Sequence, residues 1–208
     1  MRRIGALIFP DFELLDMFGP LEMFGLLEDE FEICMVSESA GPVVSNQGPK
    51  ALAEADYDSE TSYDLILVPG GRGTRREIDN PATLAWLRKV RADAELMLGV
   101  CTGSALLAQA GLLDGLRATT NKIAFDWVAG LGPEVTWVKQ ARWVRDGTTF
   151  TSSGVSAGID MSLAVIAHSL GTEKAEQVAV WAEYDWHRDP DWDPFAVIHG
   201  LVEDRSGP

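Results

Sequence analysis

Cys101 is the residue of this chain with the clearest capacity for covalent chemistry. It follows the apolar run 95–100, and Thr102-Gly103-Ser104 leads directly into an apolar helical stretch at 105–110. This order predicts a sharp strand-to-helix turn with the sulfur at the turn. Free amides at the start of the helix favour the thiolate, so we expect the pKa of Cys101 to fall below the usual value of about 8.5. The alternative is an inert core cysteine at a strand end, and the turn favours the catalytic interpretation.

The elements that must position Cys101 follow an alternating pattern. Apolar runs of strand length alternate with stretches of helical period, which favours parallel strands joined by crossover helices and an α/β fold. Ligands of such sheets bind at the carboxyl ends of the strands, where Cys101 lies. The expected strands are 4–9, 31–36, 63–68, 95–100 and two or three between 134 and 151, with a small hairpin within 41–58. The expected helices are one that starts near Asp16 with Pro20 in its first turn, then 81–92, 105–110, 157–170 and a last one from a Thr172 cap to about Trp186.

Composition and net charge limit the kinds of partner that this protein can bind. The chain has 208 residues, 46% of them hydrophobic, which suits one compact domain over 1–208. Its net charge of −15 repels phosphate backbones and anionic membrane surfaces, so we expect no nucleic-acid or membrane partner. Two cysteines cannot build a disulfide framework, and the apolar run at 4–10 is too short to span a bilayer. We expect no secretory leader, because no charged-then-apolar segment precedes this run. We therefore expect a soluble, cytoplasmic protein.

Three motifs give the chain a resemblance to a known family. The segments Leu65-Ile66-Leu67-Val68-Pro69-Gly70-Gly71, Gly99-Val100-Cys101-Thr102-Gly103-Ser104 and Thr151-Ser152-Ser153-Gly154-Val155-Ser156-Ala157-Gly158-Ile159-Asp160 resemble the ThiJ/PfpI superfamily. The resemblance covers nearly the whole chain. It implies a class I glutamine amidotransferase-like fold, a three-layer sandwich with a mostly parallel central sheet flanked by helices and a nucleophile elbow after a central strand. Cys-Thr-Gly-Ser together with Leu15-Asp16-Met17-Phe18-Gly19-Pro20-Leu21-Glu22 is most similar to the isonitrile hydratase branch, because the peptidase-like branch has His where Thr102 stands.

The resemblance also assigns site residues and a reaction. It implies Cys101 as nucleophile, Asp16 as the acid beside the sulfur, Thr102 as the neighbouring hydroxyl, Gly71 with the Thr102 amide as an oxyanion hole, and Gly70, Asn121 and Gly154 as substrate-binding residues. The implied reaction needs no cofactor. A thiolate attacks the isonitrile carbon, the nitrogen side gains a proton from a carboxylic acid, and water resolves the thioimidate to an N-substituted formamide.

One stretch departs from the family pattern. Many relatives carry His after the elbow helix, whereas this chain reads Thr119-Thr120-Asn121-Lys122, which offers an amide and a possible cation to the substrate. The three histidines, His168, His187 and His199, do not support a cysteine–histidine pair. Asp16 also has a plain alternative, because aspartate often caps a first helical turn.

Other features favour structural interpretations. Gly70-Gly71-Arg72-Gly73 lacks the Lys-Ser/Thr end of a phosphate loop. Arg72, Arg75 and Arg76 are interpreted as a solvated surface cluster, and the alternative is that they attract an anionic substrate. Cys34 is interpreted as an inert residue in the strand 31–36. The spacing of His and Cys predicts no metal site. The aromatic, proline-containing tail 187–208 must pack on the domain, the pocket lip or a second subunit, and the family implies a homodimer.

Two further functions stay open from the sequence. A glyoxalase or deglycase acting on small reactive carbonyls would use the same nucleophile, although such relatives carry Glu at the acid position and a His near the sulfur. A non-enzymatic ligand or redox-sensing module would use the same fold, as in transcription regulators that join it to a helix-turn-helix domain. The small-molecule substrate itself is not fixed by the sequence.

Overall fold

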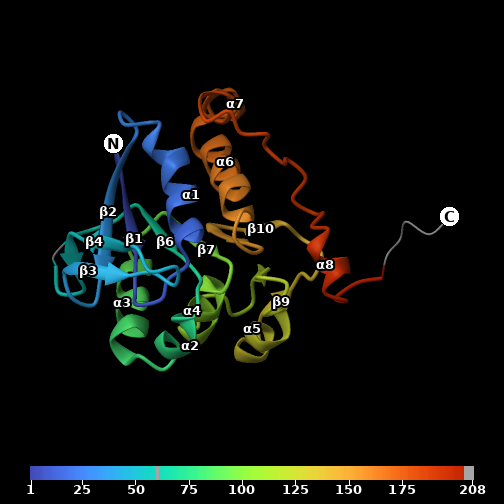
Figure 1. Ribbon diagram of the computed structural model, residues 1–208, viewed down its shortest axis with the longest axis horizontal. Coiled ribbons are helices and arrows are strands. Elements are labelled where there is room, and N and C mark those ends of the chain that lie inside the picture. The colour runs from blue at the N-terminus through green and yellow to red at the C-terminus, as the bar shows by residue number, and fades with distance from the viewer. Residues whose placement is uncertain (60, 204–208) are drawn as a thin grey trace.

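The computed structural model describes residues 1–59 and 61–203, and within them it forms a three-layer α/β sandwich (Figure 1). Seven strands make the central sheet in the order β10-β11-β7-β6-β1-β2-β5, and all neighbours are parallel except β10 and β11. The strands of this sheet are β1 (Arg2–Leu7), β2 (Phe31–Ser37), β5 (Ala55–Asp56), β6 (Leu65–Val68), β7 (Leu96–Val100), β10 (Trp143–Asp146) and β11 (Thr149–Ser152). The predicted fold class is thereby confirmed.

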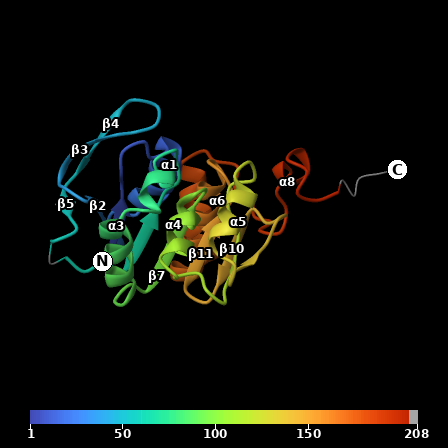
Figure 2. The same ribbon diagram turned by 90° about the horizontal axis from the view of Figure 1, so that it is seen from below.

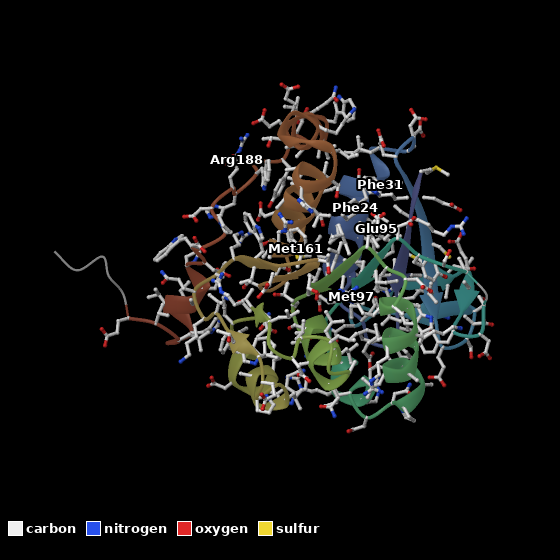
Figure 3. The ribbon with its side chains drawn as sticks, turned by 180° about the vertical axis from the view of Figure 1, so that it is seen from behind. Phe24, Phe31, Glu95, Met97, Met161 and Arg188 are labelled. Carbon is white, nitrogen blue, oxygen red and sulfur yellow. The ribbon has the colours of Figure 1, made fainter. Side chains whose placement is uncertain are left out.

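Helices cover both faces of the sheet. One face carries α1 (Leu14–Gly25), α6 (Ala157–Leu170) and α7 (Thr172–Trp181), and the other carries α2 (Thr74–Glu77), α3 (Pro81–Arg91), α4 (Gly103–Gln109) and α5 (Phe125–Leu131) (Figure 1). Both faces of the central strands are therefore buried, and every residue of β6 and β7 is buried accordingly. Phe24 of α1 and Phe31 of β2 contribute to this core, with ring centroids 5.1 Å apart in an edge-on arrangement (Figure 3).

Smaller elements complete the fold. The hairpin of β3 (Gly41–Val44) and β4 (Lys50–Ala53) confirms the predicted excursion, and β8 (Arg117–Ala118) pairs with β9 (Thr136–Trp137). The last element, α8 (Phe195–Ile198), lies at the end of the molecule opposite the hairpin (Figure 2). The segment before α8 contacts the domain through backbone hydrogen bonds, of which Arg142 N to Pro190 O measures 2.7 Å.

Several predicted boundaries are wrong. The first helix begins at Leu14, so Pro20 lies in its interior rather than in its first turn. Pro20 is buried, and its ring lies close to Gly158 of α6, so tight packing between the two helices accompanies the lost backbone hydrogen bond. The last long helix ends at Trp181 and has Gly171, not Thr172, at its N-cap position. The short helices α2, α5 and α8 carry too few residues for a periodic pattern and were not predicted.

Candidate active site

The ends of four neighbouring strands bring the predicted residues together. β11, β7, β6 and β1 lie in this order in the sheet, and the chain segments after them contain Gly154, Cys101, Gly70–Gly71 and Asp16. The chain after β7 enters α4 on one face, whereas the chain after β11 enters α6 on the other face (Figure 1). Such a divergence of neighbouring connections opens a crevice at the carboxyl edge of a sheet.

The backbone of Cys101 has a conformation that residues other than glycine rarely adopt. Its φ is 55°, in the left-handed region, where a residue other than glycine is strained. The Cys101 N–H donates to Ser152 O at 3.2 Å, and the Cys101 carbonyl accepts from Ser104 Oγ at 2.8 Å and Thr120 Oγ1 at 2.9 Å. These three hydrogen bonds fix the turn that points the sulfur into the crevice.

The sulfur of Cys101 is buried, with 5% of the residue exposed. Burial and the neighbouring Asp16 carboxylate raise the pKa of the Cys101 thiol, and the backbone N–H groups of Thr102 and Val155 oppose that shift only in part. The expected lowering of the pKa is therefore wrong, because desolvation of the thiolate outweighs the amides at the start of a seven-residue helix. Cys101 needs a proton acceptor before it attacks.

Asp16 supplies a carboxyl group beside this thiol. It is fully buried on α1, and its Oδ2 accepts a hydrogen bond of 2.8 Å from the Gly70 N–H. Burial raises the pKa of Asp16 to about 8, although the Gly70 amide and a hydrogen-bonding contribution from Cys101 act in the opposite direction. Within the described part of the chain, Oδ1 has no hydrogen-bond partner that meets standard geometry. The helix-cap alternative for Asp16 is excluded, because Glu13 holds the N-cap position.

Thr102 connects the sulfur turn with the turn after β6. Its Oγ1 accepts hydrogen bonds from the Gly71 N–H at 3.1 Å and from Thr74 Oγ1 at 3.2 Å. Gly71 has a φ of 122°, and a side chain there would overlap the backbone of Asp11 and Phe12. The Gly71 amide thus points toward the site, and a ligand oxygen would replace Thr102 Oγ1 as its acceptor.

Gly70 holds Asp16 and has no room for a side chain. A Cβ atom at Gly70 would lie 2.6 Å from both Thr102 N and Thr102 Oγ1, and 2.8 Å from Asp16 Oδ2. Only glycine leaves room for this arrangement. The structure therefore places Gly70 behind the reacting groups, whereas Gly71 faces the open space.

A cavity of about 230 Å³ lies above Cys101, and we refer to it as the Cys101 cavity. Its lining includes Gly71, Cys101, Thr102 and Asn121, and the rim residues Glu13, Asn46, Arg72 and Arg75. A second cavity of about 250 Å³, the tail cavity, shares Asn121, Ile123 and Val155 with the first. Its other walls include Gly154, together with Phe195 and His199 from the tail. The two cavities therefore meet beside the nucleophile.

Asn121 and Gly154 contact each other at this meeting point. A side chain on Gly154 would overlap the Asn121 amide, and Asn121 Oδ1 accepts a hydrogen bond from the Ala124 N–H at 3.1 Å. The Asn121 Nδ2 group lies toward the Gly154 backbone. The structure thus brings two of the three predicted substrate-binding residues to the cavity walls.

Two oxygen atoms of the protein hold the ammonium group of Lys122. Its Nζ donates to Thr119 Oγ1 at 2.8 Å and to the Ala141 carbonyl at 2.6 Å, and the residue is buried. Burial lowers the pKa of Lys122 to about 8. Lys122 also lines the tail cavity, so its role as a cation for the substrate stays a prediction, and these two oxygen atoms hold its ammonium group in place.

No histidine lines the Cys101 cavity. His199 lines the tail cavity, and His168 is exposed on α6, where its Nε2 lies 3.1 Å from Arg145 Nη2. Among residues 1–59 and 61–203, no three His, Cys, Asp or Glu side chains form a group suited to a metal ion. No helix of the same residues has the length and apolar character needed to cross a membrane.

Three residues that support the candidate site are not predicted from the sequence. Thr120 and Ser104 hold the carbonyl of Cys101, and Val155 directs its amide toward the sulfur with a φ of 46°. In the sequence, Ser104 is only the last residue of the Cys-Thr-Gly-Ser motif and has no separate predicted role. Val155 contributes a backbone group, so its side chain carries no chemical signal, although the small residues around it indicate a tight turn.

Comparisons with known proteins place this site in a family context. The model of the DJ-1/PfpI family matches residues 2–168. Isonitrile hydratase of Pseudomonas putida is 36% identical over 182 residues, which cover 88% of this chain and 78% of the hydratase. The HTH-type transcriptional regulator CdhR of Pseudomonas aeruginosa is 32% identical over 83% of this chain, which spans only 52% of the regulator. The crystal structure of a ThiJ/PfpI family protein from Pseudomonas syringae has a TM-score of 0.82 at 33% identity, covering 88% of this chain and 75% of that one.

Proposed function

Because this chain belongs to the DJ-1/PfpI family, we propose that it is a cofactor-free hydratase that converts an isonitrile and water into an N-substituted formamide. The observation that carries the proposal is the buried pair of Cys101, which lines the Cys101 cavity, and Asp16, whose carboxyl group lies beside the thiol. The similarity to isonitrile hydratase supports the same chemistry. The reaction is an addition of water across one carbon, so it needs a nucleophile and a proton shuttle but no electron acceptor.

In the first step, the thiol of Cys101 adds to the isonitrile carbon. The thiol proton moves to the Asp16 carboxylate as the S–C bond forms, and Asp16 returns that proton to the same carbon. The product is a thioimidate, R–N=CH–S–Cys101. An Asp16 pKa of about 8 suits this shuttle, because the carboxyl group both accepts and releases a proton near neutral pH.

In the second step, water adds to the thioimidate carbon. Asp16, again a carboxylate, accepts a proton from the water and passes it to the nitrogen. The tetrahedral adduct R–NH–CH(OH)–S–Cys101 then loses its S–C bond while its hydroxyl proton moves to the sulfur, which releases the N-substituted formamide and the thiol. We place the amides of Gly71 and Thr102 next to the adduct oxygen as its hydrogen-bond donors, with the Thr102 hydroxyl beside them.

The surrounding residues position the reacting groups and the substrate. Gly70 orients Asp16 through the hydrogen bond from its amide, and a side chain at Gly70 would separate Asp16 from Thr102. Asn121, held by Gly154 and Ala124, lies where the nitrogen substituent of the substrate leaves the Cys101 cavity. We propose that the Asn121 amide contacts the substrate there.

The first test is steady-state hydration of an aromatic isonitrile, followed by ultraviolet absorbance. Wild type is compared with Cys101→Ala, Asp16→Asn and the control Cys34→Ala, whose thiol contacts Tyr63 Oη at 3.8 Å outside the site. The proposal requires turnover in wild type and in the control, and its loss in the other two variants. Acid quenching and mass spectrometry must also find the substrate mass added to the peptide that contains Cys101. Turnover by Cys101→Ala would refute the mechanism.

A sensing function is the second candidate. The similarity to an HTH-type transcriptional regulator favours it, because this chain spans about half of that protein. A sensor would bind a small molecule or oxidise at Cys101 without turnover. Wild type that hydrates neither isonitriles nor methylglyoxal would favour the sensor over both the hydratase and a glyoxalase-type enzyme.

We also propose a cytoplasmic homodimer. Leu15 and Phe18 project from one side of α1 with 42% and 43% of their surface exposed, next to the buried Asp16 between them in sequence. Apolar side chains three residues apart on a helix form a contiguous surface that a second copy would cover. Light scattering after size-exclusion chromatography tests this, with Phe18→Glu expected to shift a dimer to a monomer.

A further inference from the structure

The rim of the Cys101 cavity carries two arginines in a strongly acidic protein. Arg72 and Arg75 both line the cavity, while the chain as a whole has a net charge of −15. A field of that sign repels anions from most of the surface. Within the described residues, the Cys101 cavity thus combines two guanidinium groups at its rim with a nucleophile at its base.

The guanidinium groups are available for a ligand. Among the described residues, neither Arg72 nor Arg75 forms an ion pair or a side-chain hydrogen bond, and both side chains are exposed. Arg75 instead lies over the ring of Trp127, with its guanidinium carbon 4.5 Å from the ring centroid. Stacking on an aromatic face orients the planar group and leaves its N–H donors free. Arg76, by contrast, pairs with Asp11 at 2.9 Å and does not line the cavity.

One acidic side chain faces the same cavity. The Glu13 carboxylate accepts hydrogen bonds from the side-chain amides of Asn46 and Gln47, which keep it on its own side of the rim. Two guanidinium groups against one carboxylate leave the rim with a net positive charge. The Arg75 side, supported by Trp127, is therefore where an anion finds donors without a competing acid.

We propose that the substrate of this site carries a carboxylate, which Arg72 and Arg75 bind while its electrophilic carbon meets Cys101. This inference rests on the proposed function and narrows it to isonitriles with a short acidic substituent, because the cavity holds about 230 Å³. Guanidinium groups recognise carboxylates through paired N–H donors, which fixes the orientation of the substrate as well as its affinity. When the two arginines hold the carboxylate at the rim, the electrophilic carbon of the substrate lies next to the sulfur of Cys101.

The test compares two substrates that differ in charge. Isocyanoacetate and its ethyl ester are assayed with wild type, Arg72→Gln, Arg75→Gln and the matched control Arg76→Gln. The ratio of kcat/KM for acid over ester is expected to fall about fivefold for each rim arginine removed, and to stay unchanged for Arg76→Gln. Added salt is expected to shrink the wild-type ratio because it screens exposed charges. An unchanged ratio in both rim variants, or an equal loss for acid and ester, would overturn the proposal.

A second measurement does not depend on isonitrile chemistry. Alkylation of Cys101 by iodoacetate and by iodoacetamide is followed by peptide mass spectrometry, and the ratio of the two rates cancels any change in the fraction of thiolate. The rim variants are expected to lose rate with iodoacetate and to keep it with iodoacetamide. If isonitriles are not hydrated but this loss is found, the hydratase fails and anion recognition stands. If isonitriles are hydrated without any charge preference in either assay, the hydratase stands and anion recognition fails.

Discussion

The turns after β7 and β11 share one conformation and differ in what they contribute. They follow neighbouring parallel strands, and each contains a residue other than glycine in the left-handed region, Cys101 with φ of 55° and Val155 with φ of 46°. Such a conformation costs roughly 1–2 kcal/mol per residue. The first turn presents a side chain to the crevice, whereas the second presents a backbone amide to the same sulfur.

The first turn therefore supplies the reacting side chain, and the second turn supplies a backbone group that supports it. The pKa of Cys34 is also raised by burial, so a shifted pKa does not distinguish the two cysteines. What distinguishes Cys101 is a cavity, a carboxyl group and amides from two turns that converge on one sulfur. Strain is thus retained at two adjacent positions of the crevice, as expected where a fold holds reacting groups in place.

The largest expected effect separates the side chains of the two turns. Cys101→Ala removes the nucleophile and should lower kcat/KM for isonitrile hydration by at least about 10³-fold, because no other group forms the covalent adduct. Val155→Ala keeps the backbone amide and should stay within about fivefold of wild type. Steady-state kinetics measures both. Comparable losses in the two variants would erase the distinction between the turns.

Asp16→Asn tests whether the carboxyl group of Asp16 exchanges protons with the thiol of Cys101. Loss of the proton shuttle should lower kcat by about 10²- to 10⁴-fold. Burial raises the pKa of folded Asp16 to about 8, so folding favours the protonated form. The stability that this proton binding supports is full below the unfolded pKa near 4 and is lost as pH rises through 8.

The same variant is therefore expected to lose activity but to gain stability. Asn is uncharged at every pH, so Asp16→Asn should be more stable than wild type at pH 8 by more than about 1 kcal/mol, and the difference should shrink toward pH 5. Urea unfolding at the two pH values measures this. A variant destabilised equally at both would show that Asp16 is a structural residue with an ordinary pKa.

The sequence predicts both turns and a substrate-binding Gly154 in the second, but it gives no sign that the Val155 amide faces the sulfur. Cys101 was predicted because thiol chemistry, small residues and a strand-to-helix switch occur together in sequence. The parallel sheet was predicted because buried central strands read as continuous apolar runs, as in β6 and β7. Both signals are local.

The missing features depend on contacts between distant segments. The pKa of Cys101 rises because Asp16 and the surrounding core remove water, and that burial is set by packing of α1 on α6. Thr120 supports the Cys101 carbonyl from 19 positions away along the chain. Lys122 turns inward because Thr119 and the Ala141 carbonyl accept its ammonium hydrogens. None of these contacts can be predicted from the spacing of residues along the sequence.

Gly70→Ala tests the support on the Asp16 side. The added methyl group would lie 2.6 Å from Thr102 N, so either Asp16 or the Cys101 turn must shift. A displacement of this size should lower kcat/KM by about 10²-fold and destabilise the fold by about 1–3 kcal/mol. The matched control is Gly130→Ala in α5, where nothing lies within 4 Å of the new Cβ. Equal activity in the two variants would contradict the assigned position of Gly70.

The smallest expected effect concerns the strain that the two turns share. Glycine adopts a positive φ freely, which relieves roughly 1–2 kcal/mol, while its larger unfolded-state entropy offsets about 0.5–1 kcal/mol. Cys101→Gly and Val155→Gly should therefore each be more stable than the corresponding Ala variant by about 0.5–1 kcal/mol, which urea unfolding resolves. Val155→Gly should also keep the rate of Cys101 alkylation within about twofold of wild type, because the amide of residue 155 remains. An Ala variant more stable than its Gly counterpart at one position alone would show that strain is held in only one turn.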